Sequence, residues 1–151
     1  MLLKLVKYSK KYLSKSSIWL SDDEIKKMTN APDLNYSEQL NWFNSLEIRD
    51  NYQIWGIELN KNPIGACGLK NITKNDAEYW GYIGEKSYWG KGLGKIILSK
   101  TLQKAKELDV ESIWLKVNKS NIRAINLYKK AGFKFINESD NISEFIMKIH
   151  L

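Results

Sequence analysis

The sequence predicts a single α/β (α+β) domain, residues 1–151, built on a mixed and mostly antiparallel sheet flanked by helices. Three observations lead to this class. The length of 151 residues and the 43% hydrophobic content suit one globular domain with its own core. Apolar residues alternate in several short segments and recur at helical spacing in others. Three expected strands follow one another between residues 52 and 83 without a helix, which indicates antiparallel pairing there.

The N-terminal third of the chain is expected to hold one strand and two helices. Apolar and basic residues alternate over residues 2–8, the pattern of a strand, and a polar irregular stretch is expected from there to residue 17. The segment Ser21–Glu24 has the spacing of a capping box, which predicts a short helix through Met28. A second helix is expected to begin at Ser37, with an apolar stripe on one face.

The rest of the chain alternates strands with two longer helices. Gly132 stands just after the second of these helices, where a left-handed residue is wanted. The resulting order is β-α-α-β-β-β-α-β-α-β-β. We expect strands at 52–59, 64–69, 78–83, 112–117, 133–136 and 144–149, and helices at 93–108 and 121–131.

Charge and cysteine content restrict the possible partners. The formal net charge is +7, yet Arg49 and Arg123 are the only arginines, and base-reading proteins usually rely on arginine. We therefore expect an anionic small molecule rather than nucleic acid. The single Cys67 excludes an internal disulfide and fits a reducing compartment. No apolar run approaches the ~20 residues that span a bilayer, and the charged start does not resemble a signal peptide. A cytoplasmic protein without a membrane partner is the expectation.

A glycine-rich segment lies between the 78–83 strand and the helix that follows. It reads Tyr88-Trp89-Gly90-Lys91-Gly92-Leu93-Gly94-Lys95. Glycine permits positive φ and close approach of a ligand, and the start of a helix offers free N–H groups with a positive dipole end. Because no Ser or Thr follows Lys95, the segment is not a P-loop. The position of the next acidic residues also fits a dinucleotide-binding fingerprint poorly. We expect a phosphate-binding loop of another type.

Two motifs together resemble the GNAT superfamily of N-acetyltransferases over almost the whole chain. The glycine loop is similar to that family's pyrophosphate-binding loop, with Gly92 and Gly94 at its two glycine positions. The segment 118–133 is similar to the second signature, Asn-x-x-Asn-x-x-Ala-x-x-x-Tyr-x-x-x-Gly-Phe. Two positions depart from the family pattern. Trp89 stands where relatives carry Gln or Arg, and Lys116 lies on the strand where some relatives carry a catalytic glutamate.

The resemblance implies acetyl-CoA as co-substrate, no metal, and direct attack of a primary amine on the thioester. Tyr128 would protonate the departing thiolate, since a phenol of pKa about 10 is protonated at pH 7. To accept the proton of the amine, Glu78 is the best-placed carboxylate, with Glu85 or water as alternatives. The residues expected to bind acetyl-CoA are Tyr82, Ile83, Gly90, Lys91, Gly92, Leu93, Gly94, Lys95 and Asn121.

The amine acceptor is expected to be an anionic small molecule. The aromatic N-terminal segments around Trp19 and Trp42 resemble those of members that acetylate amino sugars on nucleotide carriers, and Trp80 could join them in lining the acceptor pocket. Members that acetylate the N-terminal alanine of ribosomal proteins are the alternative, and a non-catalytic CoA-binding or nucleic-acid-binding module is a third. A homodimer is compatible with the sequence.

Overall fold

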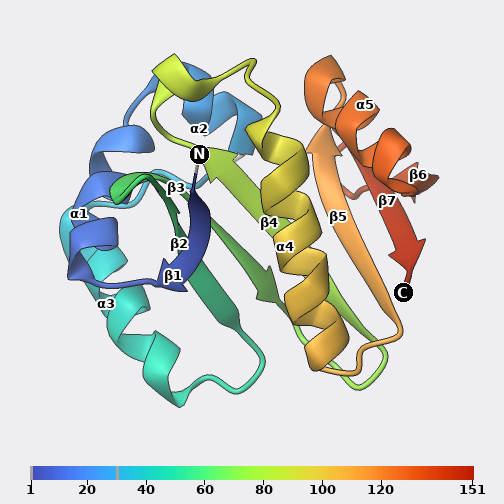
Figure 1. Cartoon of the computed structure of the whole chain (residues 1–151), viewed down its shortest axis with the longest axis horizontal. Helices are drawn as coiled ribbons and strands as arrows, with labels where there is room; N and C mark the ends of the chain where they lie inside the picture. Colours follow the sequence, from blue (N-terminus) through green and yellow to red (C-terminus); the bar gives the residue numbers. More distant parts are fainter. Residues whose placement is uncertain (1, 30) are drawn as a thin grey trace.

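One seven-stranded sheet runs through the molecule in the order β1-β2-β3-β4-β5-β7-β6 (Figure 1). The computed structural model describes residues 2–29 and 31–151. The strands are β1 Leu3–Lys7, β2 Gln53–Leu59, β3 Asn62–Lys70, β4 Asp76–Ile83, β5 Ser112–Asn118, β6 Lys134–Glu138 and β7 Glu144–His150. The helices are α1 Lys10–Trp19, α2 Asp23–Thr29, α3 Tyr36–Ser45, α4 Leu93–Glu107 and α5 Ile122–Ala131, with short 3-10 turns η1 Leu46–Ile48 and η2 Lys86–Tyr88.

All neighbouring strands pair antiparallel except β4 and β5, which are parallel. This confirms the mixed, mostly antiparallel sheet. The parallel pair is short, because its register extends only from Asp76 opposite Ser112 to Glu78 opposite Trp114. Beyond Glu78 the two strands diverge toward their carboxyl ends (Figure 1). The rest of β4, Tyr79–Ile83, therefore pairs with β3 alone.

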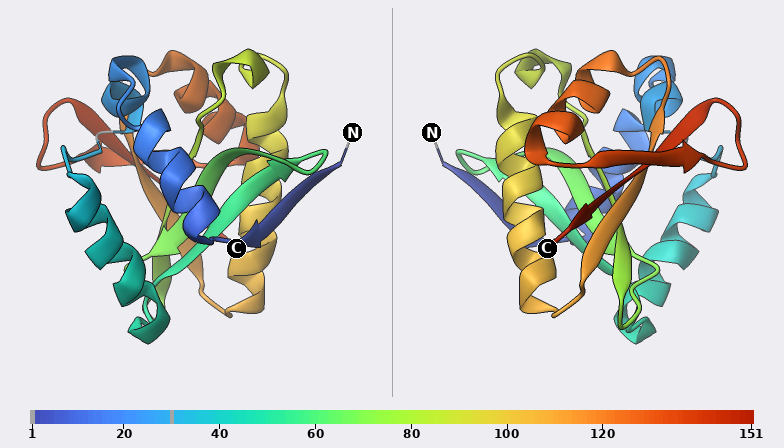
Figure 2. Two further views of the ribbon diagram at one scale, coloured as in Figure 1. Left: turned by 90° about the vertical axis from the view of Figure 1, so that its left-hand side faces the viewer. Right: turned by 90° about the vertical axis from the view of Figure 1, so that its right-hand side faces the viewer.

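The two faces of the sheet carry different sets of helices. Side chains of a strand alternate between faces, and β3 divides accordingly: Cys67 and Leu69 belong to a core that includes α4 and α5, whereas Ala66 belongs to a second core under α1, α2 and α3. Figure 2 shows α4 and α1 on opposite sides of the strands. The first core is mainly aliphatic, and the second is rich in aromatic rings.

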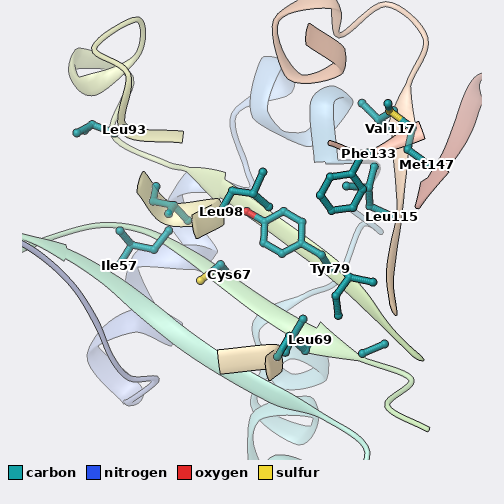
Figure 3. Packing of buried hydrophobic residues seen from close by; sticks show 14 of the residues in the cluster. Ile57, Cys67, Leu69, Tyr79, Leu93, Leu98, Leu115, Val117, Phe133 and Met147 are labelled. Carbon is teal, nitrogen blue, oxygen red and sulfur yellow. The ribbon is translucent and has the colours of Figure 1, made fainter. Parts of the chain in front are cut away.

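Helix α4 fills the centre of the aliphatic core. Of the residues that its spacing marks as buried, Leu93, Ile97, Leu98 and Ala105 are buried, and Leu102 is only partly so. Thr101 is fully buried, and its hydroxyl donates to the Ile97 carbonyl at 2.8 Å, which satisfies its polar atom within the helix. Figure 3 shows Leu98 beside the ring of Tyr79, which anchors α4 over β4.

The N-terminal region departs from the sequence-based expectation in one element. Residues expected to form an irregular polar stretch form the helix α1. Its buried face is Tyr12, Leu13, Ser16 and Trp19, which have helical spacing. The buried face includes a serine, and most other residues of the helix are lysines and serines, so a count of apolar residues alone does not reveal the pattern.

The predicted capping box at Ser21 is also wrong. The Ser21 hydroxyl donates to the Ile18 carbonyl at 2.6 Å, and Asp22 caps α2 instead, accepting from the N–H groups of Glu24 and Ile25 at 3.0 and 3.2 Å. A capping box does occur at α3, between Asn35 and Glu38. Asp and Ser are both favoured as N-cap residues, so two adjacent candidates, Ser21 and Asp22, cannot be told apart by residue type.

Candidate active site

A cleft of about 1250 Å³ opens where β4 and β5 diverge, and the predicted site residues converge on it. Its walls come from both faces of the sheet, from the loop before α4, from α2 and from the start of α5. The sequence-predicted residues that line it are Tyr82, Ile83, Gly90, Gly92, Leu93, Gly94, Lys95, Asn121 and Tyr128. Lys91, Glu78 and Glu85 do not belong to its lining.

The glycine loop adopts a backbone that side chains would disfavour. Gly90 and Gly92 have φ of 74° and 76°, in the left-handed region, and Gly92 is the residue from which α4 begins. A Cβ on either would meet only open space, so the reason for glycine is the conformation and the open approach to the backbone. Gly94 is different, because a Cβ there would lie 3.2 Å from the Leu127 side chain of α5. Gly90, Gly92 and Gly94 all line the cleft, so a ligand there can approach the backbone of the loop closely.

The charges at the start of α4 suit an anion. The first turn of α4 holds no acidic residue, although carboxylates stabilise a helix N-terminus. Lys95 stands there instead and lines the cleft, and Lys91 lies nearby with its Nζ 5.6 Å from the centre of the Tyr88 ring. Two cations at the positive end of a helix repel the dipole, and a bound phosphate would relieve that repulsion. The residues present therefore fit a pyrophosphate.

Trp89 provides a link that the sequence alone does not reveal. Its indole Nε1 donates to the carbonyl of Ile83 at 2.9 Å, which ties the glycine loop to the end of β4. The Lys86 ammonium lies 5.8 Å from the Trp89 ring and also pairs with Asp22 and Glu24 of the α2 region at 2.8 and 3.0 Å. The Trp89 side chain thus positions the loop by bonding to a backbone carbonyl of the protein. The Gln or Arg expected at this position from the family pattern would instead contact the cofactor.

Asn121 caps α5. Its Oδ1 accepts from the Ala124 N–H at 3.2 Å, so the side chain has a structural role at the start of the helix. The same side chain lines the cleft, and its NH₂ group remains the part that can donate to a ligand carbonyl.

Tyr128 projects from α5 into the cleft and is half-buried. The Tyr79 ring lies edge-on to it with 6.2 Å between centroids, and the Phe133 ring lies 5.7 Å away. Burial raises the pKa of Tyr128 from 10.0 to about 12. The hydroxyl is consequently protonated at neutral pH, as a proton donor must be before it acts.

The two candidate carboxylates are both engaged in structural contacts. Glu78 is 5% exposed, accepts from the Asn71 side chain at 3.0 Å, and has its Oε2 3.7 Å from the Lys70 ammonium. Glu85 accepts from the indole of Trp19 at 3.0 Å, which joins α1 to the segment after β4. Either carboxylate would reach an amine in the cleft only through water.

One wall of the cleft is aromatic. Trp42 and Trp80 line it, as the sequence suggested, whereas Trp19 is buried beneath the wall. Sequence reasoning missed Tyr8 and Tyr52, which join that wall because β1 and β2 place them there. The Arg49 guanidinium lies 4.9 Å from the Tyr52 ring centre, and burial raises the pKa of Tyr52. The aromatic residues themselves were the only sign in the sequence that the segments around Tyr8 and Tyr52 could contribute to a binding site.

The family follows from comparison with known proteins. The model of the acetyltransferase (GNAT) family matches residues 17–133, most of the chain. The chain therefore belongs to the GNAT acetyltransferase family. Its fold agrees: the spermidine N-acetyltransferase from Vibrio cholerae, solved with CoA and spermine, superposes with a TM-score of 0.88 at 19% identity, covering 99% of this chain and 94% of that one.

Two curated relatives resemble shorter parts of the chain. A probable spermine N(1)-acetyltransferase of Bacillus subtilis subsp. natto is 42% identical over 64 residues, 42% of each protein. The ribosomal protein bS18 alanine N-acetyltransferase of Haemophilus influenzae is 31% identical over 97 residues, 64% of this chain and 59% of the relative. The aligned part is less than two thirds of either relative's length. These relatives differ in their acceptors.

The described part of the chain contains neither a metal-binding cluster nor a membrane-spanning helix. Within residues 2–29 and 31–151, no three His, Cys, Asp or Glu side chains come together in a group that could hold a metal ion. Within the same ranges, no helix combines the length and apolar character needed to cross a membrane.

The link between Trp89 and Ile83 can be tested by removing the indole N–H. Trp89→Phe keeps an aromatic ring and loses one hydrogen bond, worth about 0.5–1.5 kcal/mol. We expect the Kd for acetyl-CoA, measured by calorimetry, to rise about 2–10-fold. Trp114→Phe is the control, because Trp114 is also half-buried but does not line the cleft. Equal affinity in Trp89→Phe and wild type would show that the loop needs no such anchor.

Proposed function

We propose that the chain transfers an acetyl group from acetyl-CoA to a primary amine by direct attack on the thioester. One observation carries this proposal: the cleft between the diverging strands joins a glycine loop at a helix N-terminus to a protonated tyrosine. The loop suits the pyrophosphate of a CoA ester, and the tyrosine suits a departing thiolate. Family membership supports the same chemistry.

The cofactor would bind along a path already present in the backbone. The N–H groups of the segment 90–95 would hold the pyrophosphate, and Lys95 would add positive charge. The amide-rich pantetheine arm would run beside the end of β4 near Tyr82 and Ile83, where no neighbouring strand competes with it. A backbone N–H on that edge could polarise the thioester carbonyl.

The residues then divide the proton transfers. The amine nitrogen forms a bond to the acetyl carbon, and the carbon–sulfur bond breaks. The Tyr128 hydroxyl gives its proton to the sulfur, which leaves as the thiol of CoA. The amine's proton passes to water, with Glu78 or Glu85 as the candidate carboxylates for a water-mediated route. A proton from the solvent then restores the Tyr128 hydroxyl. No metal is assigned a role.

Removing the Tyr128 hydroxyl tests its role. A positioned general acid contributes a factor of about 10²–10⁴ to the rate. Tyr128→Phe should therefore lower kcat by at least about 100-fold, with little change in the Kd of acetyl-CoA. Because the pKa is raised to about 12, the wild-type rate should show no loss of this acid below pH 10.

A matched tyrosine separates chemistry from packing. Tyr12 is buried, its pKa is also raised to about 12, and it lies outside the cleft lining. Tyr12→Phe should therefore retain the wild-type kcat. Release of free thiol from acetyl-CoA measures both variants. A Tyr128→Phe enzyme that keeps most of its kcat would reduce Tyr128 to a packing residue.

For the acceptor, we propose an amino-sugar amine carried on a nucleotide diphosphate. The net charge of +7, the aromatic wall and the exposed Lys116 at the cleft support an anionic, ring-containing molecule. Among the described residues, three acidic ones line the cleft. Glu24 and Asp33 are paired with lysines, and Glu144 accepts from the Ser139 hydroxyl at 3.5 Å, which weakens the case for a polycation. The Bacillus relative favours a polyamine as the second candidate, and the Haemophilus relative a peptide N-terminus as the third.

Salt dependence distinguishes these acceptors. For a nucleotide-linked amino sugar, KM should rise several-fold as ionic strength increases from about 0.05 to 0.3 M, because lysines attract the carrier. Lys116→Gln should reduce that dependence, whereas Lys100→Gln, exposed on α4 away from the cleft, should not. Spermidine and an alanine-led peptide complete the panel. Efficient acetylation of either, with none of any nucleotide-linked amino sugar, would replace this proposal by the corresponding alternative.

A further inference from the structure

We propose that the Ser16 hydroxyl, aligned by Tyr8 and Tyr82, recognises the acceptor by donating a hydrogen bond to an oxygen on it. This inference rests on the proposed function, since it concerns the acceptor side of the same cleft. Ser16 would then be a specificity-determining residue that selects hydroxylated amines, such as amino sugars, over amines that carry only N–H groups.

Three hydroxyls from distant parts of the chain meet at this point. Tyr8 follows β1, Ser16 lies on α1, and Tyr82 lies on β4. The Tyr8 hydroxyl donates to Ser16 Oγ at 2.8 Å, and the Tyr82 hydroxyl donates to the same oxygen at 3.0 Å. All three residues line the cleft, and Tyr8 and Ser16 are only 6% and 5% exposed. We refer to these three residues as the hydroxyl hub.

A count of protons shows what the hub leaves available. A serine hydroxyl has one proton to donate and two lone pairs to accept. Both lone pairs of Ser16 receive tyrosine protons, so its own proton is not used within the hub. Among residues 2–29 and 31–151, Ser16 Oγ has no hydrogen-bond partner beyond these two tyrosines. A ligand oxygen in the cleft would accept this proton and complete the three hydrogen bonds of the Ser16 hydroxyl. A buried donor left without a partner costs free energy.

The surroundings favour a neutral oxygen next to an apolar face. Burial raises the pKa of Tyr8 to about 12 and also raises the pKa of Tyr82, so the hub stays uncharged. The Trp80 ring stacks on Tyr82 at 6.3 Å, and Trp42 meets Tyr8 edge-on at 5.8 Å. A sugar ring combines C–H faces for such rings with hydroxyls for the hub. An ammonium group has only donors and cannot accept the Ser16 proton.

The test measures binding separately from turnover. Wild type saturated with CoA is titrated with 2-, 3- and 4-aminocyclohexanols, glucosamine and cyclohexylamine, following tryptophan fluorescence, since Trp80 stacks on the hub. We expect at least one hydroxylated amine to bind about 2–10-fold more tightly than cyclohexylamine. In Ser16→Ala that ratio should fall to about one, because the donor is gone. The Ser14→Ala variant, exposed on the same helix and outside the cleft lining, should keep the wild-type ratio.

The outcomes separate the two proposals. A wild-type enzyme without preference for hydroxylated amines, or a preference unchanged in Ser16→Ala, overturns the role of Ser16. An equal loss for all amines in Ser16→Ala also overturns it, because that result describes a packing defect. If Ser16→Ala does not fold, Ser16→Cys, which retains the volume but donates weakly, must lower the ratio in its place. A wild-type preference that is lost in Ser16→Ala, in an enzyme that acetylates none of these amines, supports the hub and contradicts the proposed function instead.

Discussion

The short parallel contact between β4 and β5 is the constraint on which the site depends. Three residue pairs hold the strands together, and beyond Glu78 they separate. Had the pairing continued, the N–H and C=O groups of Tyr79–Ile83 on that side would be used within the sheet, and no cleft would form. Because it stops, both faces of the sheet open into one space, and the backbone of β4 is available to a ligand.

Contacts around this opening hold the walls in place. The helix α4, anchored by Leu98 and the fully buried Thr101, brings its N-terminus to the end of β4. Trp89 then fastens the loop to Ile83, and Lys86, just before the loop, pairs with Asp22 and Glu24 at the start of α2. The glycine-loop wall and the α2 wall of the cleft are therefore joined by a few polar contacts, so a shift of one wall is passed directly to the other.

Much of this arrangement could be predicted from the sequence, because it depends on local patterns. The alternation of apolar and polar residues revealed the strands. Gly90 and Gly92 have the positive φ that a glycine-rich loop permits. Helix α1 was missed because its buried face includes Ser16. The contacts of Ser16 with Tyr8 and Tyr82 become visible only in the folded structure. The link from Trp89 to a backbone carbonyl was likewise invisible, since hydrogen bonds to backbone leave no signature in residue types. Glu78 was chosen by its position in a strand. Its contact with Lys70 depends on the register of β3 against β4, and its contact with Asn71 depends on the turn between these strands.

The central claim, that the backbone of the glycine loop binds acetyl-CoA, is tested most directly by comparing two glycines of the same conformational class. Gly92 begins α4 in the cleft with φ of 76°, and Gly132 ends α5 outside the cleft lining with φ of 105°. Alanine is disfavoured by roughly 1–2 kcal/mol in left-handed backbone, so both variants should lose stability. Titration calorimetry with acetyl-CoA on the folded proteins should show at least a tenfold weaker Kd for Gly92→Ala, about 1.4 kcal/mol, and an unchanged Kd for Gly132→Ala. Wild-type affinity in a folded Gly92→Ala variant would contradict the account.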